Sequence, residues 1–282
     1  MLTSLIKSVY RKYKKPIKIT FAIGFIIVSI HIIHALTLDR IVVFTQIDFE
    51  SSNLPPRMNG YRVAFITDPH YINFRSLENV IDRLNQENID LLLLGGDFAR
   101  HHNTMEKSIE IIATTNTTHG IFGVEGNHDN HDLLRYVKES NGIGFLSNQG
   151  LHIKDGFFVG GVRDPWRGFA NIESAIEGSY SDDFIILISH QPDVVMEQST
   201  VGIDLILSGH LHGGQITFFG FAAPALWSPV LTNYGQRFMK GFSTSADGIP
   251  IYTSRGLGHR PSSHFTRIFA RPEVVIFTLY SS

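Results

Sequence analysis

The chain has 282 residues, with 24 basic and 26 acidic side chains, 14 His and no Cys. This length suits one large domain or two small ones, and 43% hydrophobic with 18% charged residues excludes a disordered or fibrous protein. The lack of Cys excludes a disulfide scaffold and any thiolate-ligated metal site. Fourteen His is a high count that needs a chemical explanation.

The first 38 residues have two unlike parts. Residues 1–18 carry six basic and no acidic side chains, whereas residues 19–38 carry no formal charge. A helix of about 20 apolar residues spans the ~30 Å hydrocarbon core of a bilayer. The positive-inside rule places the basic flank in the cytoplasm. We therefore expect a basic cytoplasmic tail (1–18) and a single-pass anchor (19–38) in the cell (inner) membrane, with the bulk of the chain on the non-cytoplasmic side.

Two other interpretations of this segment remain open. A cleaved signal peptide usually has a shorter apolar core and a small-x-small cleavage site, which residues 33–35 match poorly. A buried core helix would not need six preceding cations. The anchor is favoured over both.

The rest of the chain is acidic. Residues 19–282 hold 18 basic and 26 acidic side chains, a net charge of −8. Nucleic-acid binding domains are usually basic, because much of their affinity comes from phosphate contacts. The charge therefore disfavours a nucleic-acid partner and a nuclease.

Strands and helices alternate beyond a linker segment at residues 39–60. Continuous apolar runs predict buried strands, and apolar residues at helical spacing predict amphipathic helices. The pattern predicts one α/β domain over residues 61–282. The predicted strands are 41–44, 62–67, 90–94, 120–124, 184–189, 205–208 and 273–279, with hairpin strands in 143–162; the predicted helices are 75–85, 104–114 and 132–140.

Five of these strands end in short segments of acids, amides and imidazoles. The segments are Asp68–His70, Gly95–Asp97, Gly126–Asp129, Ser189–His190 and Gly209–His212. Ligand sites of open α/β sheets lie outside the carboxyl ends of the strands. Asp68 and His70 are two residues apart, so an extended backbone would place both side chains on one side. Oxygen and nitrogen donors suit Mn, Fe, Zn or Co, and Asp97 is the candidate bridge between two ions.

The motif order D-x-H, G-D, G-N-H-D/E, H and G-H-x-H over residues 61–212 resembles the calcineurin-like metallophosphoesterase superfamily. The resemblance implies an α/β fold, a four-layer sandwich of two mixed β-sheets flanked by helices, here preceded by one transmembrane helix. It also implies two divalent metal ions at the strand ends. Mn is the expected metal, with Fe, Zn or Co as alternatives.

The resemblance assigns residues by position. One ion would take Asp68, His70, Asp97 and His212, and the other Asp97, Asn127, His190 and His210. His128 would protonate the leaving oxygen or stabilise the transition state, and Asp129 would pair with it and raise its pKa. Arg255 and Arg163 are candidates for binding substrate phosphate. Most other cations near the C-terminus, including Arg260 and Arg267, are interpreted as a solvated surface.

Residues 208–215, 254–258 and 272–274 resemble a membrane-anchored bacterial subfamily, some of whose members are similar to UDP-2,3-diacylglucosamine pyrophosphatases. The resemblance implies cleavage of a phosphodiester or diphosphate in a phosphorylated small molecule or lipid, such as UDP-2,3-diacylglucosamine or another envelope precursor. Two interpretations of the apolar loop at 216–230 remain open: it contacts acyl chains or the bilayer, or it packs against the domain's own hairpin. The alternatives are a phosphomonoesterase, a protein phosphatase, or a non-catalytic membrane-tethered module that binds phosphate.

Overall fold

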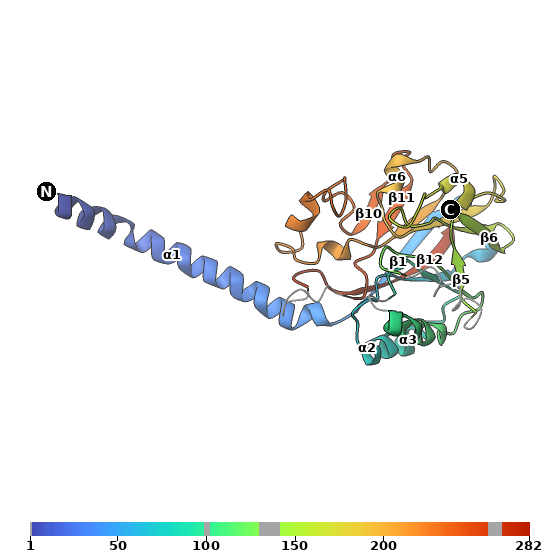
Figure 1. Cartoon of the computed structure of the whole chain (residues 1–282), viewed down its shortest axis with the longest axis horizontal. Helices are drawn as coiled ribbons and strands as arrows, with labels where there is room; N and C mark the ends of the chain where they lie inside the picture. Colours follow the sequence, from blue (N-terminus) through green and yellow to red (C-terminus); the bar gives the residue numbers. More distant parts are fainter. Residues whose placement is uncertain (1, 99–101, 130–141, 259–266) are drawn as a thin grey trace.

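The computed structural model describes residues 2–98, 102–129, 142–258 and 267–282. A long helix, α1 (Leu2–Leu36), projects from a domain built on two sheets (Figure 1). The predicted helix at 132–140 lies outside the described residues.

Helix α1 stays exposed along its apolar stretch. The segment Tyr13–Arg40 has a mean hydropathy of 2.2 in its most apolar window, of which 6% is buried. A core helix would be mostly buried, so that interpretation is wrong. The length and composition suit a membrane anchor or a signal sequence.

The first sheet has the strand order β1-β12-β2-β3-β4-β5. Strand β12 pairs in parallel with β1 and antiparallel with β2, and β2 to β5 are parallel. The predicted strand at 41–44 begins at Val43 and continues to Ser51 because β12 pairs along its whole length. The strands are β1 (Val43–Ser51), β2 (Tyr61–Ile66), β3 (Leu91–Leu94), β4 (Ile121–Val124), β5 (Gly144–Leu146) and β12 (Glu273–Ser281).

The second sheet has the order β10-β11-β9-β8-β7-β6. Its central strands are parallel, and β6 and β10 are antiparallel edge strands. Strands β8 and β9 have the predicted bounds, whereas β10 and β11 were not predicted. The strands are β6 (Gln149–Lys154), β7 (Phe157–Gly161), β8 (Phe184–Ser189), β9 (Leu205–Ser208), β10 (Gly241–Thr244) and β11 (Pro250–Thr253).

Helices cover the outer faces of both sheets. Helices α2 (Phe74–Leu84) and α3 (His102–Ala113) lie on the first sheet, and α5 (Ile172–Ala175) and α6 (Val194–Glu197) lie on the second (Figure 1). Their apolar side chains pack against those of the strands. The core between the sheets includes Phe65, Leu93 and Ile186. The predicted four-layer sandwich is confirmed. The 3-10 helices are η1 (Leu38–Arg40), η2 (Pro56–Met58), η3 (His212–Gly214) and η4 (Pro224–Trp227).

The sequence explains why these elements form. Strand β3 is four leucines, all buried, as expected for a parallel strand covered on both faces. Helix α2 buries one apolar face, and the Asn73 side chain accepts a hydrogen bond from the Ser76 amide at its N-terminus. The loops after β2, β3, β4, β8 and β9 are thereby brought together at one edge of the sandwich.

Candidate metal centre

The loops after the strands turn sharply at predicted ligand positions. Asp68, Asp97, His210 and His212 all have positive φ, between 50° and 68°. This conformation is costly for residues other than glycine and is concentrated at functional sites. The extended backbone on which the placement of Asp68 and His70 depended therefore does not continue past β2. Tight turns, fixed by hydrogen bonds such as Asp68 N to Gly96 O at 2.9 Å, orient these side chains instead.

Glycine is required where two of these loops meet. A Cβ at Gly209 would collide with the Thr67 hydroxyl and the Asp68 carboxylate, and one at Gly126 would collide with the Asp97 carboxylate. The backbones after β9 and β4 therefore lie directly against the first two carboxylates.

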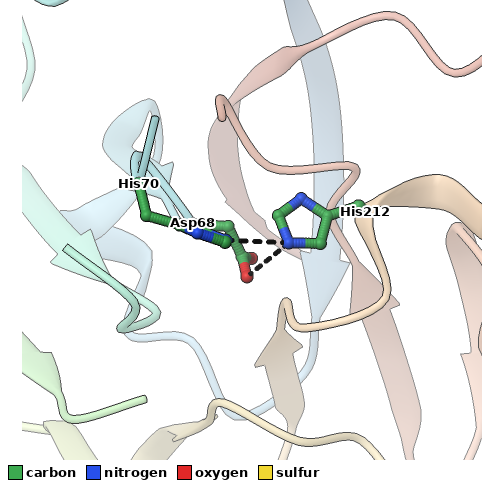
Figure 2. A group of neighbouring side chains, drawn as sticks. All are labelled: Asp68, His70 and His212. Atoms are coloured by element: carbon green, nitrogen blue, oxygen red, sulfur yellow. Dashed lines mark hydrogen bonds and ion pairs between the residues drawn. The ribbon is translucent and has the colours of Figure 1, made fainter. Parts of the chain in front are cut away.

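Asp68, His70 and His212 form a buried group whose ligand atoms lie within 4.8 Å of one another (Figure 2). The Nε2 atoms of the two imidazoles are 2.9 Å apart, and His212 Nε2 is 3.5 Å from Asp68 Oδ1. These three residues match three of the four predicted ligands of one ion.

Asp68, Asp97 and His190 form a second buried group. His190 Nε2 lies 3.5 Å from Asp97 Oδ2 and 3.0 Å from Asn127 Oδ1. Asp97 Oδ2 is also 3.8 Å from His70 Nε2, so this oxygen lies between the imidazoles of the two groups. Asp68 belongs to both groups, while the predicted bridging role of Asp97 stays a prediction.

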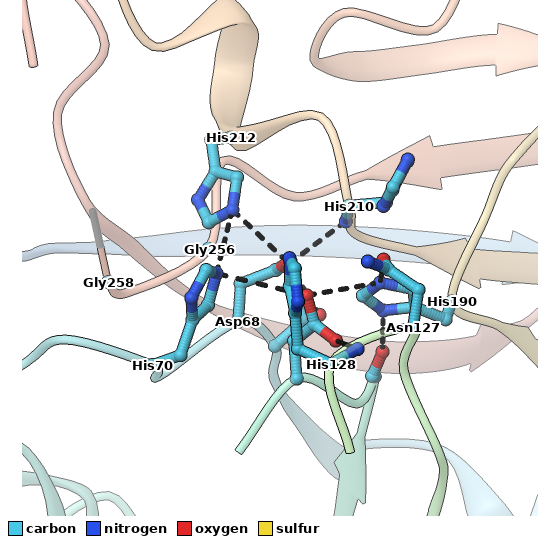
Figure 3. Close-up of polar contacts among 12 residues, drawn as sticks. Asp68, His70, Asn127, His128, His190, His210, His212, Gly256 and Gly258 are labelled. Carbon is cyan, nitrogen blue, oxygen red and sulfur yellow. Dashed lines mark hydrogen bonds and ion pairs between the residues drawn. The ribbon is translucent and has the colours of Figure 1, made fainter. Parts of the chain in front are cut away.

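Three buried atoms of the predicted ligand residues have no hydrogen-bond partner within the described part of the chain, His70 Nδ1 and two others. The two others are Asp68 Oδ1 and His210 Nε2. The His210 ring lies 5.1 Å from the ring of His190 (Figure 3). A buried polar atom without a partner is costly, and a bound cation would satisfy both atoms.

Burial keeps three of the histidines neutral. It lowers the pKa of His70 and His210 to about 3 and the pKa of His212 well below the usual value. Burial also raises the pKa of Asp68 to about 6. A neutral imidazole has a free lone pair, which is the form that binds a metal ion.

His190 behaves differently. Burial lowers its pKa, but attraction to the Asp97 carboxylate outweighs burial and raises the pKa well above the usual value. Its Nδ1 is 2.6 Å from the Gly95 carbonyl oxygen, and Nε2 faces the oxygens of Asn127 and Asp97. Since both nitrogens face acceptors, positive charge is needed at Nε2, as a proton or a metal ion. The donor set therefore fits divalent metal ions.

His128 lies at the pocket beside these groups. Its backbone amide donates to Asp97 Oδ1 at 2.8 Å, and its ring is 5.5 Å from the ring of His70 (Figure 3). His128 lines a cavity of about 180 Å³ together with His70, Asp97 and Asn127. Ile216, Leu226 and Leu231 form an apolar wall of the same cavity.

The Asp129 carboxylate connects the ligand loops. Oδ2 accepts hydrogen bonds from the amides of Asp97 (2.8 Å) and Gly126 (2.7 Å), and Oδ1 accepts one from Phe98 (2.8 Å). Burial, followed by repulsion from Asp97, raises its pKa to about 8. Asp129 thus holds the loops after β3 and β4 together, and its predicted pairing with His128 stays a prediction.

Replacing Asp129 with Ala is expected to destabilise the protein by about 3 kcal/mol or more, because three amides lose their acceptor. Urea unfolding of the metal-free protein measures this loss. The control Asp182→Ala removes an exposed acid and should cost about 0.5 kcal/mol or less. Equal stability of the two variants would show that Asp129 does not hold the loops.

The two predicted phosphate-binding arginines are engaged by carboxylates. Arg255 Nη2 lies 2.8 Å from Glu273 Oε1, and Arg255 Nε lies 3.1 Å from Glu273 Oε2. Arg163 Nε is 3.3 Å from Glu125 Oε1. The described residues that line the cavity include neither arginine, so their role in substrate binding stays a prediction.

Arg267 is a functional candidate that the sequence analysis missed. It is 1% exposed, which corrects its interpretation as a surface cation; Arg260 lies outside the described residues. Its guanidinium donates to the carbonyl oxygens of Gly256, Gly258 and Ala270 and lies 3.3 Å from His212 Nδ1. Arg267 therefore supports the loop that carries His212. Its place in a run of basic residues gave no signal of this burial.

A family model described as calcineurin-like phosphoesterase matches residues 61–214, which include every predicted metal ligand and His128. The chain belongs to this family. With its two buried metal-binding groups, this calcineurin-like protein is a metal-dependent phosphoesterase, a hydrolase.

Bacterial relatives match most of this phosphoesterase. The uncharacterized metallophosphoesterase YkuE of Bacillus subtilis is 27% identical over 252 residues, covering 84% of this chain and 85% of YkuE. The phosphodiesterase YaeI of Escherichia coli is 28% identical over 234 residues, covering 78% of this chain and 82% of YaeI. A solved dimetal phosphatase from Danio rerio, 11% identical, has a TM-score of 0.45 over 79% of this chain and 93% of that chain, a likeness too distant to bear on the site.

Proposed function

We propose that the chain is a membrane-anchored phosphohydrolase that uses two divalent metal ions, Mn²⁺ first, to cleave a phosphodiester or diphosphate bond in a lipid or envelope precursor. The observation that carries the proposal is the cavity in which ligand residues such as His70 and Asp97 meet the apolar wall formed by Ile216, Leu226 and Leu231. A phosphate group fits the polar end of this cavity, and an apolar substituent fits the wall.

Different residues of the chain would hold the ions and donate the proton. Asp68, His70, Asp97 and His212 would hold one ion, and Asp97, Asn127, His190 and His210 the other. When bound, two such ions stabilise charge on the attacking and leaving oxygens of a phosphoryl transfer. His128 donates a proton to the leaving oxygen from its position at the cavity.

Two observations support a substrate larger than a phosphomonoester. The relative YaeI is named a phosphodiesterase, at 28% identity. The apolar wall can contact a second, apolar substituent on the phosphate, which the smallest monoesters lack. The apolar helix α1, as the proposed anchor, would keep the domain at a membrane, where a lipid substrate is found.

The basic tail at residues 1–18 supports a domain on the non-cytoplasmic side. An envelope phosphoester is then a better substrate candidate than UDP-2,3-diacylglucosamine, because UDP-linked precursors are cytoplasmic. A reporter fused after Ser282 distinguishes the two sides.

The proposal is tested with the full chain in lipid nanodiscs, loaded with Mn²⁺. A chromogenic monoester, a chromogenic diester and a lipid-linked nucleotide diphosphate are compared. We expect the diester or the diphosphate to be hydrolysed at least about tenfold faster than the monoester. Equal rates on all three contradict the substrate class, a preference for the monoester indicates a phosphomonoesterase, and no turnover indicates a binding module.

A further inference from the structure

A group of exposed apolar side chains lies at the mouth of the metal cavity. Phe221, Trp227 and Val230 are 83%, 67% and 71% exposed, and Ile216 and Phe218 are exposed as well. We call these five residues the apolar rim. Ile216 also lines the cavity, and Trp227 and Val230 are chain neighbours of the wall residues Leu226 and Leu231. Several large exposed apolar side chains on the segment that lines a cavity mark a candidate interaction site.

The end of α1 packs against Phe218 and Phe219, in the chain segment that carries the apolar rim. The His31 ring lies 4.4 Å from the ring of Phe219 and 5.6 Å from that of Phe218. The His34 ring stacks on Phe269 at 3.9 Å. Figure 1 shows α1 reaching the domain at the side where the chain around residues 215–240 lies.

Backbone hydrogen bonds fix this contact. The Asp39 carboxylate, 4% exposed, accepts from the amides of Phe269 at 2.8 Å and Ala270 at 3.0 Å. His34 Nδ1 lies 2.8 Å from the same carboxylate. The Phe269 ring also lies 5.2 Å from the ring of Phe219, so the end of α1 is connected through Phe269 to the segment that carries the rim.

The position of His31 sets the depth of the rim. His31 lies in the uncharged stretch 19–38, and a rise of about 1.5 Å per residue puts it about 12 Å before Asp39. An anchor that crosses the ~30 Å hydrocarbon core over this stretch carries His31 below the bilayer surface. Phe218 and Phe219, in ring contact with His31, then lie at the same depth.

We propose that the apolar rim inserts into the bilayer that α1 spans, so that the metal cavity opens at the level of the lipid headgroups. This inference rests on the anchor in the proposed function. Aromatic side chains favour the membrane interface.

Tryptophan fluorescence tests the insertion in the full chain. The sequence has two Trp, so Trp166→Phe leaves Trp227 as the sole reporter. In nanodiscs of phosphatidylcholine and phosphatidylglycerol, lipids brominated close to the headgroup should quench Trp227 about twofold. Phe221→Trp in a chain without other Trp is a second reporter of the rim.

The matched control is Tyr180→Trp in the chain without other Trp. Tyr180 is 66% exposed and contacts His152 of β6, which lies on the side of the domain away from α1 (Figure 1). Brominated lipids should leave this reporter unquenched.

A third reporter, Phe25→Trp within the uncharged stretch of α1, tests the anchor by quenching with lipids brominated deep in the acyl chains. If Phe25→Trp is quenched but either of the two rim reporters is not, the inserted rim is overturned and the anchor stays in place. A lack of quenching at all three positions overturns the anchor as well.

Discussion

Replacing Asp97 with Asn is expected to release bound metal and lower turnover by about 10³-fold or more. Burial alone would raise the pKa of Asp97, but attraction to His190 and His70 outweighs it and holds the pKa below its usual range. The carboxylate is therefore charged, with Oδ2 between the two imidazoles. Asn keeps the shape and the hydrogen bond from the His128 amide, but it removes the negative charge.

The measurement is metal content by mass spectrometry after desalting, together with turnover. Asp182→Asn, a change at an exposed acid outside the cavity lining, is the control and should keep both metal and activity. Retention of two ions per chain in Asp97→Asn would show that Asp97 does not bridge them.

Replacing His128 with Ala is expected to keep the metal and lower turnover by about 10²–10⁴-fold. His128 lines the cavity but belongs to neither of the two buried metal-binding groups. Its contact with Asp97 comes from the backbone amide, which the alanine variant keeps. The variant therefore removes the imidazole alone.

The leaving group separates proton donation from other roles of His128. A nitrophenolate leaves without a proton, so the variant should lose less activity on a nitrophenyl diester than on an alkyl diester. His152→Ala removes an imidazole paired with Asp183, away from the cavity lining, and should leave both rates unchanged. Equal losses on both diesters in His128→Ala would exclude a general acid.

The sequence predicted best what depends on local pattern. Strands β8 and β9 have the predicted bounds because each is a continuous apolar run, buried on both faces. A metal site was predictable because polar segments recur after five strands, whereas the division of its ligands between two ions came from the resemblance to the family. Strands β10 and β11 were missed because four-residue segments containing Gly and Pro carry little strand signal.

Features that depend on contacts between distant parts of the chain could not be predicted from local sequence. The length of β1 is set by β12, and Val43 pairs with Glu273 at the opposite end of the chain. The left-handed turns at Asp68 and His210 depend on close approach between loops rather than on residue type. The burial of Arg267 likewise follows from the carbonyl oxygens that surround it, which come from several segments.

If α1 is the proposed membrane anchor and the substrate is a lipid, the fixed contact between α1 and the domain affects how substrate is found. Asp39 binds the amides of Phe269 and Ala270, and Arg267, two residues earlier, supports His212. A domain on a loose tether would sample many orientations and meet substrate from bulk water. A domain held in one orientation on the bilayer meets lipid substrate by lateral diffusion in two dimensions. Its rate would then follow the mole fraction of substrate in the membrane rather than its concentration in solution.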